Sequence, residues 1–511
     1  MTGGTCNNQI NNPLLLDSQT DTGLMKNRLR RFAVKVTISL IGLLFLLSSG
    51  CKTKEVKDDR FLELMSLYNA GNFFSLAQSA DSIKRLTLSS DINRKIDSLL
   101  DLAARFRLEF SLTEKEVDSL LNDRLIQFSD EDKQRWERAN WLEYMVIDGE
   151  KLYFKRTVTN LELMLKYYGH YSYLANPFIS NNEDSSKLSN VRKILEVSSG
   201  RGEPVLPVQM QLEYSINLLP GSVLPGELVR CWLPFPRMLP GRQNLLDPIT
   251  FSPGSEIISP EDVPHRSVYM EQYADATGSA DFFEKFIFES SAVWFNLEDA
   301  EILPYDTTAL MYKEYTKEQP PHIVFNERIN DLSDEVVGHE NDPREIVRRI
   351  FYWIDGAIPW AGALEYGIIP DIPGYVLDNF RGDCGMKTLL FMTLARYNGI
   401  PVRWQSGWML FPDEVNLHDW CEVYYEGLGW VPLDMSFGLM PSDDIREKEF
   451  YLSGLDGYRF TVNSDIGGKF HPTKRYLRSE PWDFQRGELE SDARNLYFNQ
   501  WRYRMNVVWL N

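Results

Sequence analysis

Hydrophobic side chains recur at helical spacing between about residues 60 and 195, for example at Val117, Leu120, Leu121 and Leu125. This spacing places them on one face of a helix. Two segments in the same region, Thr113-x-x-Glu116 and Ser129-x-x-Asp132, are similar to the capping box that begins many helices. The pattern predicts a packed helical domain over 60–195, to which we assign no chemistry.

From about 203 to 325 the hydrophobic period changes to two. Residues 210–218 alternate between apolar and polar side chains, which is typical of a half-buried antiparallel strand. A second strand-like run, 228–234, follows the Pro225-Gly226 turn and contains Cys231. We therefore predict a small β-sandwich over 203–325, with Cys231 as a thiol of its core.

The segment 340–440 begins with a strong helix start at Asp342-Pro343 and then carries Gly382-Asp383-Cys384-Gly385 ahead of an apolar helix. Cys384 is thereby predicted at a helix N-terminus. Free amides and the positive end of the helix dipole stabilise a thiolate there, and the same amides can bind an oxyanion. This position favours Cys384 as a nucleophile over a buried, inert thiol.

Two strand-like runs follow, on either side of the Gly427-Leu-Gly429 turn. A tight hairpin brings His418 in the first run close to Asp434 in the second. Asp434 can then accept a hydrogen bond from one imidazole nitrogen while the other nitrogen faces Cys384, as in a nucleophile, base and orienter triad. Asp419 and Cys421 lie on the opposite face of the strand, so we expect Cys421 in the core and Asp434 as the orienter.

These motifs together resemble the transglutaminase-like superfamily over about residues 342–437. The resemblance implies a papain-like fold in an α+β chain, with Cys384 as nucleophile, His418 as base and Asp434 as orienter. The family often ends its last motif Asp-Pro-Thr, whereas this chain reads Asp434-Met-Ser. An upstream aromatic or amide side chain often helps the oxyanion in this family, and Trp360 is a candidate for that role or for a purely structural one.

The chemistry that follows is attack of the Cys384 thiolate on a carboxamide or peptide carbonyl, giving a thioester that water or an amine releases. We favour hydrolysis, expect no cofactor or metal, and expect a peptide or protein substrate. One alternative is a non-enzymatic envelope lipoprotein that binds a polysaccharide or protein partner. A papain-like peptidase proper is disfavoured because it predicts Cys near the mature N-terminus and an Asn orienter.

The N-terminal region has the parts of a bacterial export signal. Basic residues lie within 26–35, an apolar run covers 36–47, and small residues precede Cys51. We interpret 25–50 as a lipoprotein signal peptide, with Met25 as the true start and Cys51 as the lipidated residue. A cleaved signal without lipid and an uncleaved anchor are the alternatives. Each places the body of the protein outside the cytoplasm, and lipidation of Cys51 would anchor it to the cell envelope, in the periplasm or at the outer membrane.

Composition narrows these possibilities further. The formal net charge of -19 argues against nucleic-acid binding, because phosphates would be repelled. The 5 cysteines and 6 histidines show no metal-ligand spacing. The last segment, 441–511, is rich in aromatic residues and is predicted to cover the core or to shape the rim of the cleft.

Overall fold

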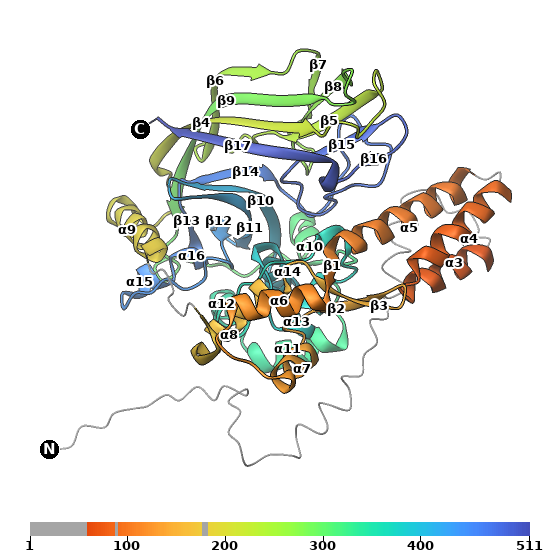
Figure 1. Cartoon of the computed structure of the whole chain (residues 1–511). Coiled ribbons are helices and arrows are strands. Elements are labelled where there is room, and N and C mark those ends of the chain that lie inside the picture. Colours follow the sequence, from red (N-terminus) through yellow and green to blue (C-terminus); the bar gives the residue numbers. More distant parts are fainter. Residues whose placement is uncertain (1–58, 87–89, 176–181, 511) are drawn as a thin grey trace. The chain divides into compact units, whose positions relative to one another are not determined.

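The computed structural model describes residues 59–86, 90–175 and 182–510, which form an α+β protein with four antiparallel sheets (Figure 1). The predicted signal peptide at 25–50 and the lipidation of Cys51 lie outside these residues. No helix in the described part of the chain is both long enough and apolar enough to cross a membrane. The sheets contain three, four, five and five strands.

The N-terminal region is mainly helical. Its helices are α3 (Asp59–Asn69), α4 (Phe73–Leu86), α5 (Ser90–Glu109), α6 (Glu114–Arg124), α7 (Asp130–Arg138), α8 (Thr157–Tyr167), η1 (Tyr171–Tyr173) and α9 (Asn182–Val197). Both predicted capping boxes are confirmed, because Thr113 caps α6 and Ser129 caps α7. The region also contains a small sheet that the helical pattern did not predict, made of β1 (Phe110–Thr113), β3 (Glu150–Phe154) and β2 (Tyr144–Ile147). Strands of this length hold too few residues to show a period.

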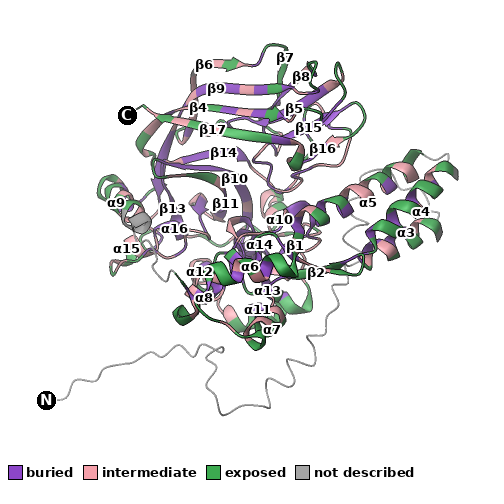
Figure 2. Ribbon diagram, viewed as in Figure 1, coloured by how far each residue is buried: buried purple, intermediate pink, exposed green. Residues whose placement is uncertain are grey.

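Two five-stranded sheets share one hydrophobic core. The first has the order β13 (Gly454–Leu455), β9 (Asp281–Trp294), β4 (Val205–Leu218) and β17 (Trp501–Trp509), with β6 (Gln243–Phe251) also on β9. The second has the order β16 (Asn495–Leu496), β15 (Glu488–Ser491), β5 (Leu228–Pro234), β8 (Ser267–Tyr273) and β7 (Ser255–Ile258). The apolar members of the alternation predicted in 210–218 all face this core, and Cys231 is fully buried in it. Figure 2 shows the buried residues along β4, β5 and β9.

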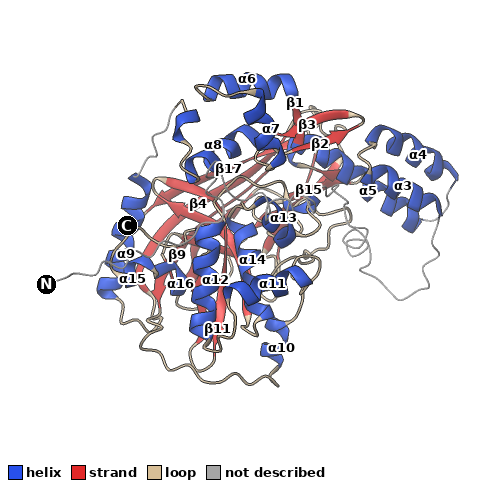
Figure 3. Cartoon of the chain, turned by 90° about the horizontal axis from the view of Figure 1, so that it is seen from below, coloured by secondary structure: helices blue, strands red, loops and turns tan. Residues whose placement is uncertain are grey.

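The four-stranded sheet carries the segment with the candidate chemistry. Its order is β12 (Gly429–Leu433), β11 (Glu414–Tyr425), β10 (Val402–Phe411) and β14 (Arg459–Asn463). Helix α14 (Cys384–Tyr397) packs on β11 and β10, and α12 (Pro343–Ala357) packs on α14 (Figure 3). The helix start predicted at Asp342-Pro343 is confirmed, because the Asp342 side chain caps α12 and Pro343 is its first residue.

Short helices connect or follow these strands: α10 (Leu310–Thr316), α11 (Glu327–Val336), η2 (Tyr366–Ile368), α13 (Ile372–Asn379), α15 (Ile445–Lys448), α16 (Phe450–Ser453) and η3 (Phe498–Gln500).

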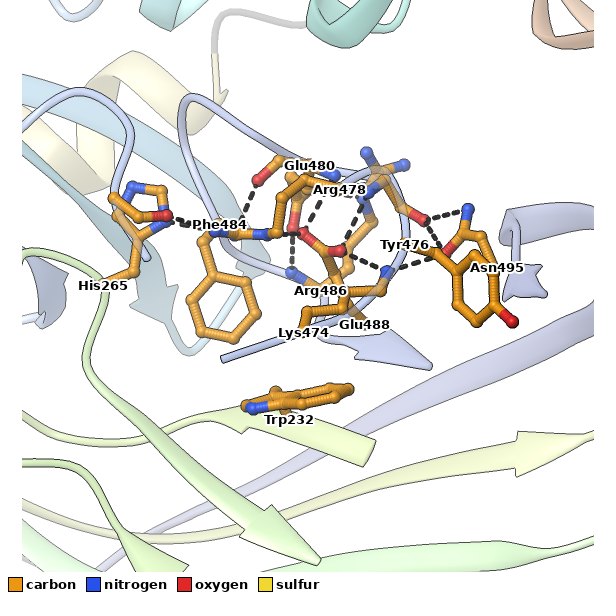
Figure 4. Close-up of polar contacts among 12 residues, drawn as sticks. Trp232, His265, Lys474, Tyr476, Arg478, Glu480, Phe484, Arg486, Glu488 and Asn495 are labelled. Atoms are coloured by element: carbon orange, nitrogen blue, oxygen red, sulfur yellow. Dashed lines mark hydrogen bonds and ion pairs between the residues drawn. The ribbon is translucent and has the colours of Figure 1, made fainter. Parts of the chain in front are cut away.

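The C-terminal segment contributes strands to three of the sheets. Strand β14 extends the four-stranded sheet, while β17 pairs with β4 along the whole length of β17 (Figure 1). A buried ionic cluster fixes the loop that precedes β15. In this cluster Glu488 accepts hydrogen bonds from Lys474, at 2.6 Å, and from Arg478 (Figure 4). Although burial opposes ionisation, Arg478 and Lys474 lower the pKa of Glu488 to about 2, so it is a carboxylate.

Candidate active site

Cys384 is the first residue of α14, as the sequence predicts. Asp383 is the N-cap, and its carboxylate accepts a hydrogen bond from the Met386 amide. The thiol is half-buried, whereas Cys421 is fully buried and its sulfur contacts the carbonyl of Leu433, so the expectation of a core position for Cys421 is confirmed. Cys384 is therefore the more accessible of these two thiols.

The Cys384 thiol donates a hydrogen bond to Asp419 Oδ2 at 3.3 Å. The other carboxyl oxygen of Asp419 accepts from Gln485 Nε2 at 2.8 Å, and this amide also donates to the carbonyl oxygen of His418. Asp419 and Gln485 are both buried. The sulfur thus has an acidic partner that is itself held in place by a third side chain.

A glycine permits this close approach at the start of α14. A Cβ atom on Gly385 would lie 2.6 Å from Asp419 Oδ2 and 2.5 Å from the Tyr366 hydroxyl. Contacts this short do not occur between real side chains, so any larger residue would push Asp419 or Tyr366 aside. Tyr366 in turn donates a hydrogen bond to Asp383. Because Gly385 has no side chain, the Asp419 carboxyl group and the Tyr366 hydroxyl can both lie close to the start of α14.

The electrostatic environment of Cys384 differs from the sequence-based expectation. We expected the helix N-terminus to stabilise a thiolate, but burial, and then the nearby Asp419 and Asp383, raise the pKa of the Cys384 thiol well above its usual value. A carboxylate at hydrogen-bond distance disfavours a second negative charge more strongly than free amides favour one. The expectation of a lowered thiol pKa is wrong for this arrangement, in which the thiol keeps its proton.

His418 and Asp434 form the contact expected from the hairpin. His418 Nε2 lies 2.7 Å from Asp434 Oδ2, and both side chains are buried. Arg459 on β14 reaches the same carboxylate at 2.9 Å and also pairs with Asp456. Burial alone would raise the pKa of Asp434, but the neighbouring His418 imidazole and the charge of Arg459 lower it below its usual value. Asp434 is therefore a firmly ionised partner for the imidazole.

His418 itself favours the neutral form. Burial lowers the pKa of His418, although the charge of Asp434 opposes this shift. A neutral imidazole can accept a proton, which is what a general base requires.

The structure does not join all three predicted residues in one hydrogen-bonded chain. His418 and Asp419 are consecutive in β11, so their side chains point to opposite faces of the strand. The sulfur of Cys384 is on the Asp419 side, while Asp434 is on the His418 side. Within the described residues, no hydrogen bond links Cys384 to His418. The triad of Cys384, His418 and Asp434 therefore stays a prediction.

Trp360 lies beside the loop that leads to Cys384. Its backbone forms a parallel bridge with Gly382, and the amide of Ala361 donates to the carbonyl of Gly382 at 3.2 Å. Trp360 is 46% exposed, so part of its side chain is available at the surface. Its role in binding an oxyanion stays a prediction.

Sequence reasoning missed two residues of this site. Asp419 lies next to His418, and alternation along the strand correctly placed it away from the imidazole, but gave no sign that it meets the sulfur. Gln485 is 66 residues further along the chain and belongs to no motif. Among the described residues, no group of three or more His, Cys, Asp or Glu side chains is arranged to hold a metal ion.

The segment around this site matches a known family. Residues 330–435 match the model of the transglutaminase-like superfamily. This segment is a transglutaminase-like domain. The match covers Cys384, His418 and Asp434, and it confirms the resemblance drawn from the sequence motifs. No curated protein matches the chain.

Solved structures similar to the chain have low identity to it. A candidate cysteine protease from Cytophaga hutchinsonii is 12% identical, with a TM-score of 0.41, over 60% of this chain and 92% of that one. The periplasmic domain of TgpA from Pseudomonas aeruginosa is 14% identical, with a TM-score of 0.22, over 44% of this chain and 88% of that one. The same domain bound to ethylmercury also has a TM-score of 0.22 at 14% identity, over 52% of this chain and 97% of that one. Because these TM-scores are low, the assignment of residues 330–435 to the transglutaminase-like superfamily depends on the family model alone.

Proposed function

We propose that this protein is a thiol enzyme that cleaves or transfers amide and peptide acyl groups through a thioester on Cys384. The observation that carries the proposal is the placement of a half-buried cysteine at the head of α14 in a domain whose His418 and Asp434 are paired at 2.7 Å. A nucleophile at a helix N-terminus has nearby backbone amides that can stabilise an oxyanion. A base held by a buried carboxylate has a fixed orientation.

In the proposed reaction, the Cys384 sulfur attacks the acyl carbon of a carboxamide or peptide. For this the thiol leaves its hydrogen bond with Asp419 and gives its proton to His418, while Asp434 stabilises the imidazolium. The C–N bond then breaks, the amine departs with the proton from His418, and the acyl group remains on sulfur. Water then attacks the thioester carbon, the C–S bond breaks, and the sulfur regains a proton as the acyl group leaves as a carboxylic acid. Hydrolysis is favoured over transfer to an amine because no sequence feature specifies an amine site.

The proposed place of action is the bacterial cell envelope, with a peptide or protein as substrate. The support comes from the sequence: a basic segment, an apolar run and small residues ahead of Cys51 match a lipoprotein signal. A lipid-linked Cys51 would tether the domain to a membrane. The net charge of -19 favours a substrate other than nucleic acid.

The test uses the protein without its signal segment, with Cys384→Ala and Cys421→Ala as matched variants. An activity-based thiol probe followed by peptide mapping should label Cys384 in the wild type and in Cys421→Ala. Release of peptides from a denatured protein substrate would demonstrate hydrolysis, and incorporation of a fluorescent primary amine would demonstrate transfer. Either activity must disappear in Cys384→Ala, and activity that survives in this variant would refute the proposal.

A second candidate function is a non-catalytic envelope lipoprotein that binds a polysaccharide or a protein. The observation that favours it is the contact of Cys384 with Asp419 in place of His418, together with the raised pKa of the thiol. This candidate predicts no labelling of Cys384 at any pH and no loss of partner binding in Cys384→Ala. The same labelling experiment therefore separates the two functions.

A further inference from the structure

The hydrogen bond between Cys384 and Asp419 holds the sulfur in a fixed position. The sulfur donates to one carboxyl oxygen of Asp419, and Gln485 holds the other at 2.8 Å. Asp419 is 1% exposed, so the acidic partner of the sulfur is shielded from solvent. We propose that Asp419 is a positioning residue that holds Cys384 as a protonated thiol, facing away from His418, until this hydrogen bond is broken.

The proposal rests on the proposed function, because it concerns the same nucleophile. It adds a step before catalysis: the sulfur must leave Asp419 before it can meet the imidazole. Consecutive residues of β11 place Asp419 and His418 on opposite faces, so one sulfur position cannot serve both partners. Asp419 and His418 therefore compete for the thiol.

The surroundings of Asp419 favour the protonated thiol. The titratable groups that face it come from three other parts of the chain and are acidic or neutral: Asp383 and Cys384 at the start of α14, Tyr366 in η2, and Glu480 and Asp483 in the C-terminal segment. Burial, and then Asp483 and Asp383, raise the pKa of Asp419 itself. No basic side chain within the described residues pairs with Asp419. Lys387 on α14 interacts electrostatically with Cys384, but burial lowers the pKa of this lysine. A thiolate beside Asp419 would add negative charge to the acidic cluster.

Glycine at position 385 supports the same interpretation. Its missing Cβ leaves the space that Asp419 Oδ2 and the Tyr366 hydroxyl occupy. A structure that needed only a helix start after Cys384 would tolerate alanine there. The glycine instead allows the carboxyl group to reach the sulfur.

The experiment measures the rate at which iodoacetamide alkylates Cys384 between pH 5 and 10, by peptide mapping. In this reaction the thiolate sulfur bonds to carbon, iodide leaves, and the thiol proton passes to solvent. In the wild type we expect a midpoint higher than the value of about 8.5 for a free cysteine, because burial and the nearby Asp419 raise the pKa of the thiol. A wild-type midpoint below about pH 8 would overturn the proposal without any variant.

Asp419→Asn removes the ionisable carboxyl group and keeps the size of the side chain. We expect its alkylation rate at pH 7 to rise at least about tenfold, with a midpoint lower by about one pH unit. Asp483→Asn is the matched control, because Asp483 belongs to the same acidic cluster without contacting the sulfur. We expect it to change the rate less than Asp419→Asn does. Circular dichroism and the Tm of each variant establish that it is folded.

An unchanged or slower rate in folded Asp419→Asn would refute the restraint, as would an equal gain in Asp483→Asn. Failure of the proposed function has a different signature. In that case no acyl group would appear on Cys384 when wild type or Asp419→Asn is incubated with a reactive ester, whatever the alkylation profile. The two ideas are therefore tested by separate readouts on the same proteins.

Discussion

Two buried acids near strand β11 have opposite electrostatic surroundings: Asp419, which belongs to β11, and Asp434, which follows β12 and pairs with His418 of β11. On one face, Asp434 is paired with His418 and Arg459, and these charges lower its pKa despite burial. On the other face, Asp419 has acidic neighbours, and burial together with these neighbours raises its pKa. Both side chains are almost completely buried. Counter-charge, rather than depth, therefore decides the direction in which the pKa of each acid moves.

This difference bears on how the domain can work. On the His418 face, Arg459 forms ion pairs with both Asp434 and Asp456. These ion pairs hold the Asp434 carboxylate in place, and the carboxylate can then orient His418 as a base. The Asp419 face keeps a proton close to the nucleophile. The sulfur of Cys384 is on the second face, so a change of partner from Asp419 to His418 is the step that would turn a restrained thiol into a reactive one.

The largest loss of stability is expected when Arg459, the cation that pairs with Asp434 and Asp456, is replaced. Arg459→Met leaves Asp434 and Asp456 buried without their counter-charge, and the free energy of unfolding should fall by about 3–5 kcal/mol. Urea denaturation measures this loss. Arg446→Met is the matched control, because Arg446 makes an exposed ion pair with Asp444 and its removal should leave the midpoint unchanged. Equal midpoints for wild type and Arg459→Met would contradict the network.

A smaller loss is expected when the approach of Asp419 to the helix start is blocked. In Gly385→Ala the new methyl group meets Asp419 and Tyr366, which should cost about 1–3 kcal/mol of the free energy of unfolding. The thiol should also become more reactive, because Asp419 is displaced from the sulfur. Gly356→Ala in α12 is the control, since no atom lies within 4 Å of its added Cβ. Thermal denaturation that ranked Gly356→Ala as the more damaging change would argue against this packing.

Glu284 is a third buried acid, and it can be compared with Asp434 because it lacks a positively charged partner among the described residues. Glu284 on β9 is fully buried, and within the described residues neither of its carboxyl oxygens has a hydrogen-bond partner. Burial raises its pKa well above the usual value. Glu284→Leu removes a buried polar group without a partner and should increase the free energy of unfolding by about 1–2 kcal/mol at pH 7.

The sign of the pH dependence follows from the same shift. Above about pH 4.5 the unfolded chain loses the Glu284 proton while the folded chain keeps it, so stability falls as pH rises towards the folded-state pKa. The advantage of Glu284→Leu over wild type should therefore grow between pH 5 and 7, by at most about 1.4 kcal/mol per pH unit. Urea midpoints at several pH values measure it, and an advantage that shrank over this range would show that Glu284 is ionised in the folded protein.

Local patterns were sufficient to predict the main elements of the site. The Gly382-Asp383-Cys384-Gly385 turn ahead of an apolar run predicted the start of α14 at Cys384. Alternation on either side of a glycine turn predicted the hairpin that joins His418 to Asp434. Long-range contacts carry no such local signal. The pairing of Gln485 with Asp419 and of β17 with β4 depends on how distant segments fold together. The raised thiol pKa likewise depends on a neighbour that only the folded chain supplies.

The most direct test of the account is whether Cys384 becomes acylated. Wild type, Cys384→Ala and Cys421→Ala are incubated with a reactive acyl ester, quenched in acid and weighed by intact-protein mass spectrometry, with peptide mapping of the product. The account predicts one acyl group on Cys384 in wild type and in Cys421→Ala, and none in Cys384→Ala. Acylation that persists in Cys384→Ala, or a wild type that is never acylated, would contradict it.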